Sequence, residues 1–553
     1  MILVILLIVL GMPVWSAAQT YSTLMITQPI ATGVAGTGLD ANHRVFRQYT
    51  GIPYNIRATG KGGKYPYTWT FVSGAPSGMT IENGPCTANG KLCTAGTINW
   101  PNPLTGTYSN ITIRLTDALG NTVDAVWTLV VSTTACSNAG GFCFVDAVNG
   151  NDANNGDIGT PFQTPTGLKA VRTGHQIVYF RTGTYTLNQA TSVWTFREDV
   201  SGPVIWICYP GETCTIDWQS TGGPEVTMLE YNGKNVYMDS FQYARVGSMG
   251  IRYVNNNRYG PTFRRNIGLQ LVDGENGMNS AYYMWVNANP GFPSYWGTVQ
   301  NNSLGNLSGD GGIDNGDGGS TQDMACIVKL YNAKGTIIED NDFFNSPFAE
   351  GIIAPKEETP DTTIRNNKIS GQDVLYFVFG NFNNQGGLYE KSSGEILHNL
   401  CIAASGGACL DITETHIGDI GVYEIYRNTF IGKVIAAGAA PAADHLTSAD
   451  GPFHYNNNVI ATNSYTGGSC PTRLTCLNVD DYTVLDMQAN NLQSDNDGTY
   501  VNPVTGLLVN RSLVGTKGFE LGSPPADSGL IPICSGSGAF LGGLGRCRGT
   551  GVY

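Results

Sequence analysis

The chain is poor in charged residues, since Asp, Glu, Lys and Arg together make up only 13% of its 553 residues. Its formal net charge of -13 leaves no basic excess to neutralise phosphates, which argues against nucleic acid and anionic membranes as partners. A helical bundle would carry far more Lys, Glu, Ala and Leu. The 72 glycines and 10% aromatic residues instead favour a turn-rich β protein.

Several metal-binding and catalytic motifs are also missing. The sequence contains no Cys-x-x-Cys pair and no close His-x-x-x-His pairing, so a zinc site is not indicated. It also lacks a Walker loop, a Gly-x-Gly-x-x-Gly fingerprint, a Gly-x-Ser-x-Gly elbow and a His-Glu-x-x-His helix. Any function must therefore be argued from weaker patterns.

Long apolar runs are absent after the first residues. Ile2–Leu10 is apolar, and it is followed by Pro13 and the small residues Ser16–Ala18. This pattern is typical of a signal peptide over residues 1–18, and a buried apolar strand is the alternative. The run is too short to span a bilayer. We expect a secreted protein, extracellular or at the cell surface, without membrane insertion.

The 13 cysteines agree with export, because all but Cys326 fall into close pairs. We expect these pairs to form disulfides that staple short loops, with buried free thiols as the alternative. Cys326, within an apolar stretch, reads as a small core residue. The pairs are Cys86/Cys93, Cys136/Cys143, Cys208/Cys214, Cys401/Cys409, Cys470/Cys476 and Cys534/Cys547.

Residues 19–134 alternate short β-rich runs with Gly, Pro and Asn turns. Ile111–Asn121 and Val126–Val131 predict a hairpin that ends a β-sandwich. Together with Tyr65–Trp69, Pro76–Ile81 and Gly106–Tyr108, this segment resembles the immunoglobulin-like or cadherin-like modules of bacterial surface proteins. The resemblance implies a spacer or an auxiliary binding module.

A second resemblance begins after residue 142. Phe144–Asp152, Pro161–Thr164 and Gly174–Tyr185 resemble the opening cap and first coil of right-handed parallel β-helix proteins of the pectate-lyase-like superfamily. We therefore expect an all-β chain, with an immunoglobulin-like β-sandwich followed by a right-handed parallel β-helix over residues 142–490. Residues 491–553, rich in Gly, Pro and Ser, read as a C-terminal cap or tail over the last coil.

A short repeat supports the solenoid independently. The pattern apolar-x-x-Asn/Asp-x-apolar returns every 26 to 39 residues, which indicates stacked coils. Asn at the bend between strands tolerates turn geometry and can hydrogen-bond the Asn of the next coil. The marked residues are Asp239, a degenerate copy at Asn266, Asn302, Asn341, Asn367, Asn399, Asn428 and Asn458.

The two longest steps between coils are adjacent, and insertions on neighbouring coils leave a solenoid by the same face. The second step carries Asp310, Asp314 and Asp317, which predict a calcium site or, equally, a solvated acidic turn. The first step carries aromatic residues that can stack on sugar rings or pack their loop onto the helix. The candidate substrate-binding residues are Tyr282, Tyr283, Trp285, Tyr295 and Trp296.

Candidate catalytic residues lie on later coils. The positions before the repeat Asn include His398 and Arg427, which should be side by side, and Lys391 lies one strand upstream. A base near a cation is what β-elimination of a uronate requires. Glu390–Ser393, Asn399 and Ser405–Gly407 resemble the alginate and chondroitin lyases of this superfamily. That resemblance implies Lys391 as the base, assisted by an Arg on the next coil.

Other catalytic signatures of β-helix enzymes are missing. Leu410–Glu414 contains no Arg where the lyase resemblance implies one, and the expected upstream Glu pair that binds calcium is absent. The Arg-x-Pro-x-x-Arg signature of pectate lyases is absent too. We therefore predict a secreted β-helix that interacts with polysaccharide or cell-surface glycan, as a polysaccharide lyase or related enzyme. The alternative is a non-catalytic adhesin or extracellular structural protein.

Overall fold

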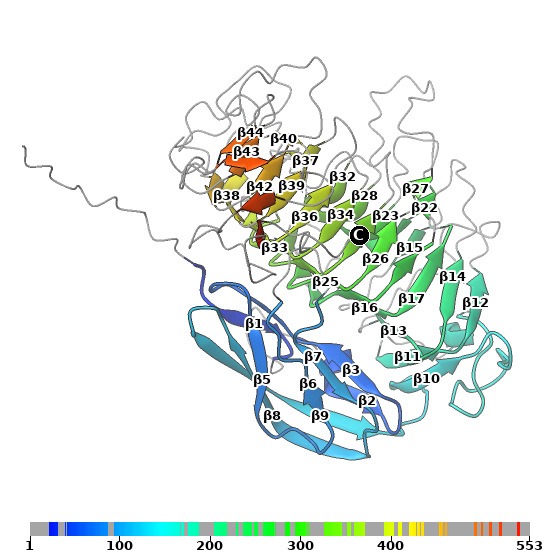
Figure 1. Cartoon of the computed structure of the whole chain (residues 1–553). Coiled ribbons are helices and arrows are strands. Elements are labelled where there is room, and N and C mark those ends of the chain that lie inside the picture. The colour runs from blue at the N-terminus through cyan, green and yellow to red at the C-terminus, as the bar shows by residue number, and fades with distance from the viewer. Residues whose placement is uncertain are drawn as a thin grey trace, which may run out of the picture.

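The fold was analysed in a computed structural model of the chain (Figure 1). It describes residues 21–30, 39, 41–86, 93–165, 167–170, 175–186, 204–217, 228–230, 236–245, 248–252, 258–269, 271–272, 282–287, 294–305, 307–308, 326–344, 351–355, 359–370, 392–402, 408–411, 420–426, 428–431, 433–435, 453–456, 459–461, 492–494, 499–501, 508–510, 519–521 and 539–541. For part of the strand residues it describes the backbone alone. In these ranges no helix has the length and apolar character needed to cross a membrane.

The N-terminal domain consists of three small sheets. One has the strand order β2-β9-β8-β5, a second β3-β7-β6, and β1 pairs with β4. A 3-10 turn, η1 (Arg44–Phe46), precedes β2. The strands are β1 (Met25–Gln28), β2 (Arg47–Tyr49), β3 (Tyr54–Arg57), β4 (Thr59–Lys61), β5 (Thr68–Ser73), β6 (Thr80–Ile81), β7 (Thr97–Trp100), β8 (Gly106–Thr116) and β9 (Thr122–Ser132).

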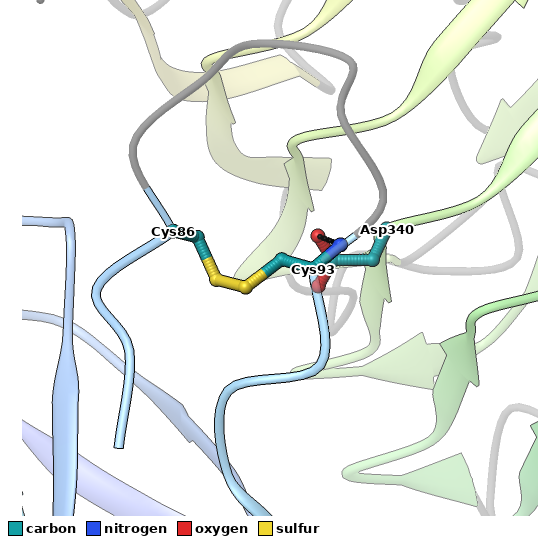
Figure 2. A group of neighbouring side chains, drawn as sticks. All are labelled: Cys86, Cys93 and Asp340. Atoms are coloured by element: carbon teal, nitrogen blue, oxygen red, sulfur yellow. Dashed lines mark hydrogen bonds between the residues drawn. A yellow bond between two sulfur atoms is a disulfide. The ribbon is translucent and has the colours of Figure 1, made fainter. Parts of the chain in front are cut away.

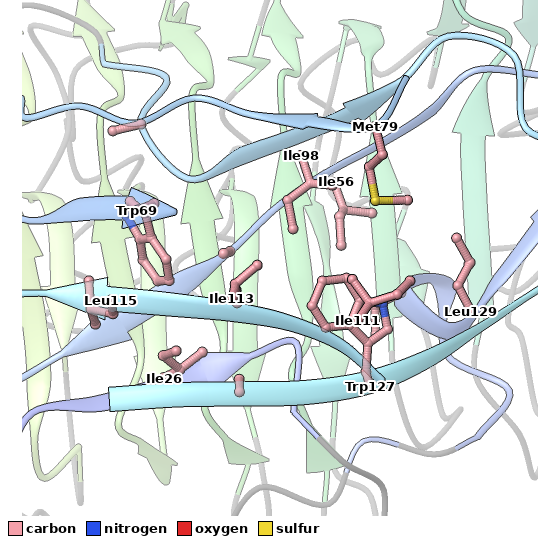
Figure 3. Packing of buried hydrophobic residues seen from close by; sticks show 14 of the residues in the cluster. Ile26, Ile56, Trp69, Met79, Ile98, Ile111, Ile113, Leu115, Trp127 and Leu129 are labelled. Atoms are coloured by element: carbon pink, nitrogen blue, oxygen red, sulfur yellow. The ribbon is translucent and has the colours of Figure 1, made fainter. Parts of the chain in front are cut away.

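The predicted hairpin is confirmed, because β8 and β9 pair antiparallel. Alternate residues of β9 are buried, as expected of a strand with one face on a core. In the core of the domain, Trp127 from β9 lies beside Ile111 from β8, and Trp69 from β5 lies near Leu115 farther along β8 (Figure 3). Asp117 closes the hairpin turn by accepting hydrogen bonds from the backbone N–H groups of Leu119 and Asn121 at 2.9 and 2.8 Å.

From Gly141 to Ser494 the described chain forms a parallel β-helix, so the all-β solenoid is confirmed. Its longest uniformly parallel sheet has eleven strands. Their order in the sheet is their order in the chain, and strands of the other sheets lie between them in sequence. They are β10 (Gly141–Val145), β11 (Gln176–Phe180), β13 (Val204–Cys208), β16 (Val236–Asp239), β20 (Thr262–Arg264), β25 (Thr298–Gln300), β30 (Ile337–Glu339), β33 (Thr362–Arg365), β35 (Ser392–Leu397), β38 (Ile420–Tyr426) and β41 (Phe453–Asn456).

A thirteen-stranded sheet follows the first sheet around each coil. Its strands are parallel up to β43, after which β44 and β45 pair antiparallel. They are β12 (Gly183–Thr186), β14 (Cys214–Asp217), β17 (Phe241–Ala244), β21 (Ile267–Gly268), β26 (Ser303–Gly305), β31 (Asp342–Phe344), β34 (Lys368–Ser370), β36 (Leu400–Ile402), β39 (Thr429–Ile431), β42 (Val459–Ala461), β43 (Leu492–Ser494), β44 (Thr499–Val501) and β45 (Leu508–Asn510).

Five shorter sheets complete the described strands. A five-stranded sheet contains β15 (Met228–Glu230), β18 (Ser248–Arg252), β23 (Tyr282–Asn287), β28 (Cys326–Tyr331) and β32 (Gly351–Pro355). A three-stranded sheet contains β19 (Arg258–Tyr259), β24 (Ser294–Tyr295) and β29 (Ala333–Lys334). Three two-stranded sheets pair β22 (Leu271–Val272) with β27 (Leu307–Ser308), β37 (Ala408–Asp411) with β40 (Lys433–Ile435), and β46 (Phe519–Leu521) with β47 (Ala539–Leu541). The 3-10 turn η2 covers Gly167–Ala170.

Register in the eleven-stranded sheet places like residues above one another. Ile364, Ile396 and Ile425 are partners on successive coils, as the repeat predicts. Side chains of successive residues alternate between the two faces of a strand. The row that faces the interior is therefore apolar and at least 96% buried where its side chains are described: Val178, Trp206, Met238, Phe263, Val299, Ile338, Ile364 and Ile396.

The repeat asparagines form a continuous ladder at the bend between the two long sheets. Asn341 donates through Nδ2 to Asn367 Oδ1 and to the Val299 carbonyl, both at 2.9 Å, while its Oδ1 accepts from the backbone and the side chain of Asn302. These bonds satisfy both atoms of the buried amide. The predicted bond between asparagines of adjacent coils is confirmed for Asn266, Asn302, Asn341, Asn367, Asn399 and Asn428.

The interpretation of Asp239 as a member of this repeat is wrong. The bend has the same length on this coil, because Met238 and Gln242 pair with Phe263 and Ile267, and Phe241 therefore stands at the position that Asn266 occupies on the next coil. The Phe241 N–H donates directly to Asn266 Oδ1, so no amide is needed on this coil. Asp239 lies on the outer face and pairs with Arg265, with Nε to Oδ1 at 2.8 Å.

Four of the six expected cysteine pairs are bonded in the structure. They are Cys86–Cys93, Cys136–Cys143, Cys208–Cys214 and Cys401–Cys409. Each closes a loop with a sequence separation of 6 to 8 residues, as the spacing predicts. The pairs Cys470/Cys476 and Cys534/Cys547 lie outside the described residues, as does the expected signal peptide.

The N-terminal domain packs against the outer face of the eleven-stranded sheet (Figure 1). Ile52 and Tyr49 contact the apolar end of this face, built from Phe142, Phe144, Ile177, Tyr179, Ile205, Ile207 and Tyr237. Farther along, Leu397 of β35 joins the core of the N-terminal domain. The domain therefore covers the outer face from β10 to β35.

Candidate functional site

The outer face changes from apolar to charged beneath the N-terminal domain. Asp239, Arg264, Gln300, Glu339 and Arg365 follow one another as register partners from β16 to β33. All five side chains are buried. A charge removed from water is tolerated only when it is paired and hydrogen-bonded, so these groups must find partners inside the interface.

We call Arg57, Glu339, Asp340 and Arg365 the interdomain ionic cluster. Arg57 comes from β3 of the N-terminal domain, and it pairs with Asp340 and, at 3.9 Å, with Glu339. Arg365 pairs with Glu339 through Nη2 and Nε at 2.6 and 2.7 Å. Burial by itself would raise the pKa of Glu339, but the two arginines lower it overall. Glu339 is therefore held as a carboxylate between them.

Tyrosines from the N-terminal domain complete the cluster. The Arg365 guanidinium lies 4.8 Å from the ring centre of Tyr67 and 5.3 Å from that of Tyr65, which are cation–π distances. Arg365 also donates to the Gly60 carbonyl at 2.7 Å. A small cavity lined by these tyrosines, Arg57 and Glu339 has room for about one water molecule. The cluster therefore fixes domain docking and leaves no space for a sugar.

Asp340 lies beside a disulfide at the edge of the cluster (Figure 2). Its Oδ1 accepts a hydrogen bond from the Cys93 N–H at 3.2 Å, and Asn366 Nδ2 donates to the same oxygen. Burial raises the pKa of Asp340 to about 6, although Arg57 acts in the opposite direction. Cys86, Cys93 and Asp340 have the proximity of a metal site, but the two sulfurs are bonded to each other and offer no thiolate.

The predicted stripe of residues before the repeat asparagines lies under the N-terminal domain. Asp340, Asn366 and His398 share a positive φ of 57°, 52° and 55°, so each occupies the same left-handed corner of its coil. His398 is 2% exposed, and its ring stands edge-on to Tyr65 at 4.9 Å between centroids. The imidazole is thus part of the docked interface rather than of an open face.

The other two candidate catalytic residues, Lys391 and Arg427, lie outside the described residues. The neighbouring ladder residues are described, and Asn399 Nδ2 donates to Asn428 Oδ1 at 3.0 Å. Asp310, Asp314 and Asp317 are also outside the described residues, and calcium binding there stays a prediction.

The candidate sugar-binding aromatics divide between two places. Tyr282, Tyr283 and Trp285 belong to β23, the central strand of the five-stranded sheet, and the structure describes their backbone only. Tyr295 belongs to β24 and is half-buried. Trp296 follows at the corner of the coil with a φ of 56°, and Lys61 of the N-terminal domain lies 5.3 Å above its ring. Trp296 is therefore engaged in domain docking.

Sequence reasoning missed a buried lysine next to this aromatic strand. Lys329 of β28 is the register partner of Trp285, and its side chain has no exposed surface. Strand alternation places Lys329 opposite the buried apolar residues Val328 and Leu330, so its side of the sheet is the outer one. Its amino group lies 5.9 Å from the Tyr331 ring centre. The available signal was a lone lysine inside the apolar run Ile327–Tyr331.

Register also brings polar residues together in the next row. Arg252 of β18, Asn287 of β23 and Tyr331 of β28 are partners on three successive coils. Together with Trp285 and Lys329 they form two neighbouring rows on the five-stranded sheet, which we call the aromatic–cation rows. Such a set combines the residue types that stack on sugar rings, hydrogen-bond hydroxyls and attract carboxylates.

Comparisons with known proteins give distant structural likenesses. No family model matches the chain, and no curated protein matches its sequence. One similar solved structure is a rhamnogalacturonan lyase, with 12% identity and a TM-score of 0.28 over 59% of this chain and 83% of that chain. Another is the pectate lyase Pel9A, with 12% identity and a TM-score of 0.36 over 73% of this chain and 96% of that chain. At these values the likenesses carry no argument about activity.

Proposed function

We propose that this protein is an exported polysaccharide-binding β-helix whose ligand face is the outer side of the five-stranded sheet. The observation that carries the proposal is the register of β18, β23 and β28, which assembles the aromatic–cation rows. The outer face of the eleven-stranded sheet is unsuitable for a polymer, because the N-terminal domain occupies it from β10 to β35.

The chemistry of the rows favours a sugar over a protein or nucleic acid ligand. An indole stacks on the C–H face of a pyranose, while amide and phenol groups hydrogen-bond its hydroxyls. The formal charge of -13 repels an anionic polymer at long range. Arg252 supplies a cation in the rows themselves, so a sugar carboxylate would gain its attraction locally, whereas Lys329 has no exposed surface for a ligand to contact.

Affinity electrophoresis against a panel of neutral and uronate-containing polysaccharides tests this proposal. We expect retardation of the parent protein by at least one polymer, and its loss in Trp285→Ala. Tyr209→Ala is a matched control, because Tyr209 stacks on Arg181 beyond the first coil, away from the five-stranded sheet. Equal retardation of Trp285→Ala and the parent would refute the proposed face.

Cleavage of the polysaccharide by β-elimination is a second candidate activity. The hydrogen bond between Asn399 and Asn428 favours it, because this bond joins adjacent coils and the two asparagines directly follow His398 and Arg427 in the sequence. In this scheme Lys391 is the base, and His398 and Arg427 stabilise the developing charge. Because Tyr65 covers His398, the scheme requires the N-terminal domain to leave the sheet.

The release of unsaturated sugar ends distinguishes the two activities. Binding without release, both in the parent and in an Arg57→Met variant with weakened docking, would leave a non-catalytic adhesin or structural protein as the function. Release that disappears in Lys391→Ala while binding persists would establish the lyase.

We infer that the N-terminal domain is an immunoglobulin-like spacer, which its opposed sheets around Trp69 and Trp127 support.

A further inference from the structure

One ion pair between the two domains uses a lysine instead of an arginine. Lys61, at the end of β4, pairs with the Asp361 carboxylate and donates to the Asp361 carbonyl at 3.0 Å. The Lys61 side chain is only 4% exposed, whereas that of Asp361 is 52% exposed. The amine is therefore shielded from water, whereas the carboxyl group is open enough for a water molecule released from it to escape to solvent.

The surroundings of this pair combine an apolar wall with a third ionisable group. The Trp296 ring lies 5.3 Å from Lys61 Nζ. Glu395, a register partner of Thr363 on the next coil, interacts electrostatically with both Lys61 and Asp361. Burial raises the pKa of Glu395, although Lys61 acts to lower it, and Ser22 Oγ donates to its Oε1 at 3.3 Å. Glu395 is thus a third ionisable group, placed on the coil next to the pair.

We propose that Lys61 and Asp361 condense to an amide bond that covalently joins the N-terminal domain to the β-helix. Arginine cannot react in this way at the neighbouring pairs, because a guanidinium stays protonated. A lysine amine becomes nucleophilic once it loses its proton, and transfer of that proton to the paired carboxylate neutralises both groups.

The atoms balance without any added reactant. The Lys61 ammonium gives one proton to the Asp361 carboxylate, and the free amine attacks Cγ, forming the Nζ–Cγ bond. Protonated Glu395 donates its proton to the departing hydroxyl and takes one from the nitrogen. The Cγ–O bond breaks, one water molecule leaves, and Glu395 regains its starting state. No oxidation or reduction takes place.

A second lysine–carboxylate pair provides an internal control. Lys368 and Asp342 lie 3.3 Å apart at the nearest atoms, but their side chains are 40% and 26% exposed. Water solvates this ammonium, so we expect the pair to remain an ordinary salt bridge. Burial of the amine, rather than proximity alone, is what the proposed reaction requires.

Intact mass spectrometry of the purified full chain after disulfide reduction tests the proposal. We expect the parent protein to be lighter by one water molecule than Lys61→Arg, after correction for the substitution itself. Peptides containing Lys61 and Asp361 should be recovered joined together. Asp361→Asn should lose ammonia instead of water, and Lys368→Arg should show the same loss of water as the parent.

The proposal fails if the folded parent has the full calculated mass and its Lys61 and Asp361 peptides are recovered separately. Folding of each variant is checked by its melting temperature and by protection of the domain junction from protease. Glu395→Gln should retain the ion pair and fold, but should accumulate the uncrosslinked mass. A folded Glu395→Gln variant that crosslinks as fast as the parent would overturn the role given to Glu395.

Discussion

Replacement of Asn341 by alanine offers a direct test of how the β-helix is held together. The Asn341 side chain is fully buried and makes four hydrogen bonds, each of 2.9 Å, in the middle of the ladder. Alanine removes all four. The Asn302 N–H and the Val299 carbonyl then lose the side-chain partners that Asn341 gave them.

The expected cost follows from the number of bonds. At roughly 1 kcal/mol net for each buried hydrogen bond, Asn341→Ala should lower the free energy of unfolding by about 4 kcal/mol. The left-handed corner belongs to the preceding residue, Asp340, so backbone strain at position 341 does not enter this estimate. The Asn399 side chain makes the same set of bonds and should respond equally.

Denaturant unfolding of the oxidised protein, followed by circular dichroism, measures the effect. Asn155→Ala is the control, because that asparagine is exposed and outside the ladder, and its replacement should change stability by less than about 0.5 kcal/mol. A loss of less than about 1 kcal/mol of unfolding free energy at both Asn341 and Asn399 would refute the reasoning, since the ladder hydrogen bonds would then contribute little to stability.

Four further outcomes are expected. Arg57→Met should leave Asp340 buried without its cation, cost about 3 kcal/mol, and expose the domain junction to limited proteolysis. Because burial raises the pKa of Asp340 from 3.8 to about 6, its contribution to docking should be fully present below pH 3.8 and should be lost as the pH rises through 6; Asp340→Asn should flatten this dependence in a docking assay. Replacing Cys86 and Cys93 together by serine should cost roughly 2 kcal/mol in thermal unfolding, and no loss would contradict a stapling role. Ile396→Asp should prevent secretion of folded protein or cost several kcal/mol, whereas a tolerated aspartate would place Ile396 outside the interior row.

The candidate ligand face was only partly readable from the sequence. The aromatic cluster around Trp285 stood out, because six aromatic residues within a short stretch are visible without knowing the coil register. Lys329 and Arg252 gave no comparable signal. Each is a single cation in its own strand, and both become neighbours of β23 only through pairing with strands more than twenty residues away.

The stripe around His398 illustrates a different limit. The repeat correctly placed Asp340, Asn366 and His398 at equivalent corners, where they share the same left-handed backbone. It could not indicate that Tyr65 and Arg57 would lie on top of them. Asp239 was misassigned because an aspartate with suitably spaced apolar neighbours looks like the repeat asparagine, and only the strand pairing shows that it is a partner of Arg264 rather than of Asn266.

The sequence by itself determined the coils, the asparagine ladder and the local disulfides. Each of these features joins positions that are either close in the chain or one repeat apart, so spacing and residue type suffice to predict them. Docking of the N-terminal domain was decided only in three dimensions. The ion pair between Arg57 and Asp340 joins residues 283 positions apart in the chain. The two domains bury apolar surface against each other, and the charges enclosed between them must then be paired.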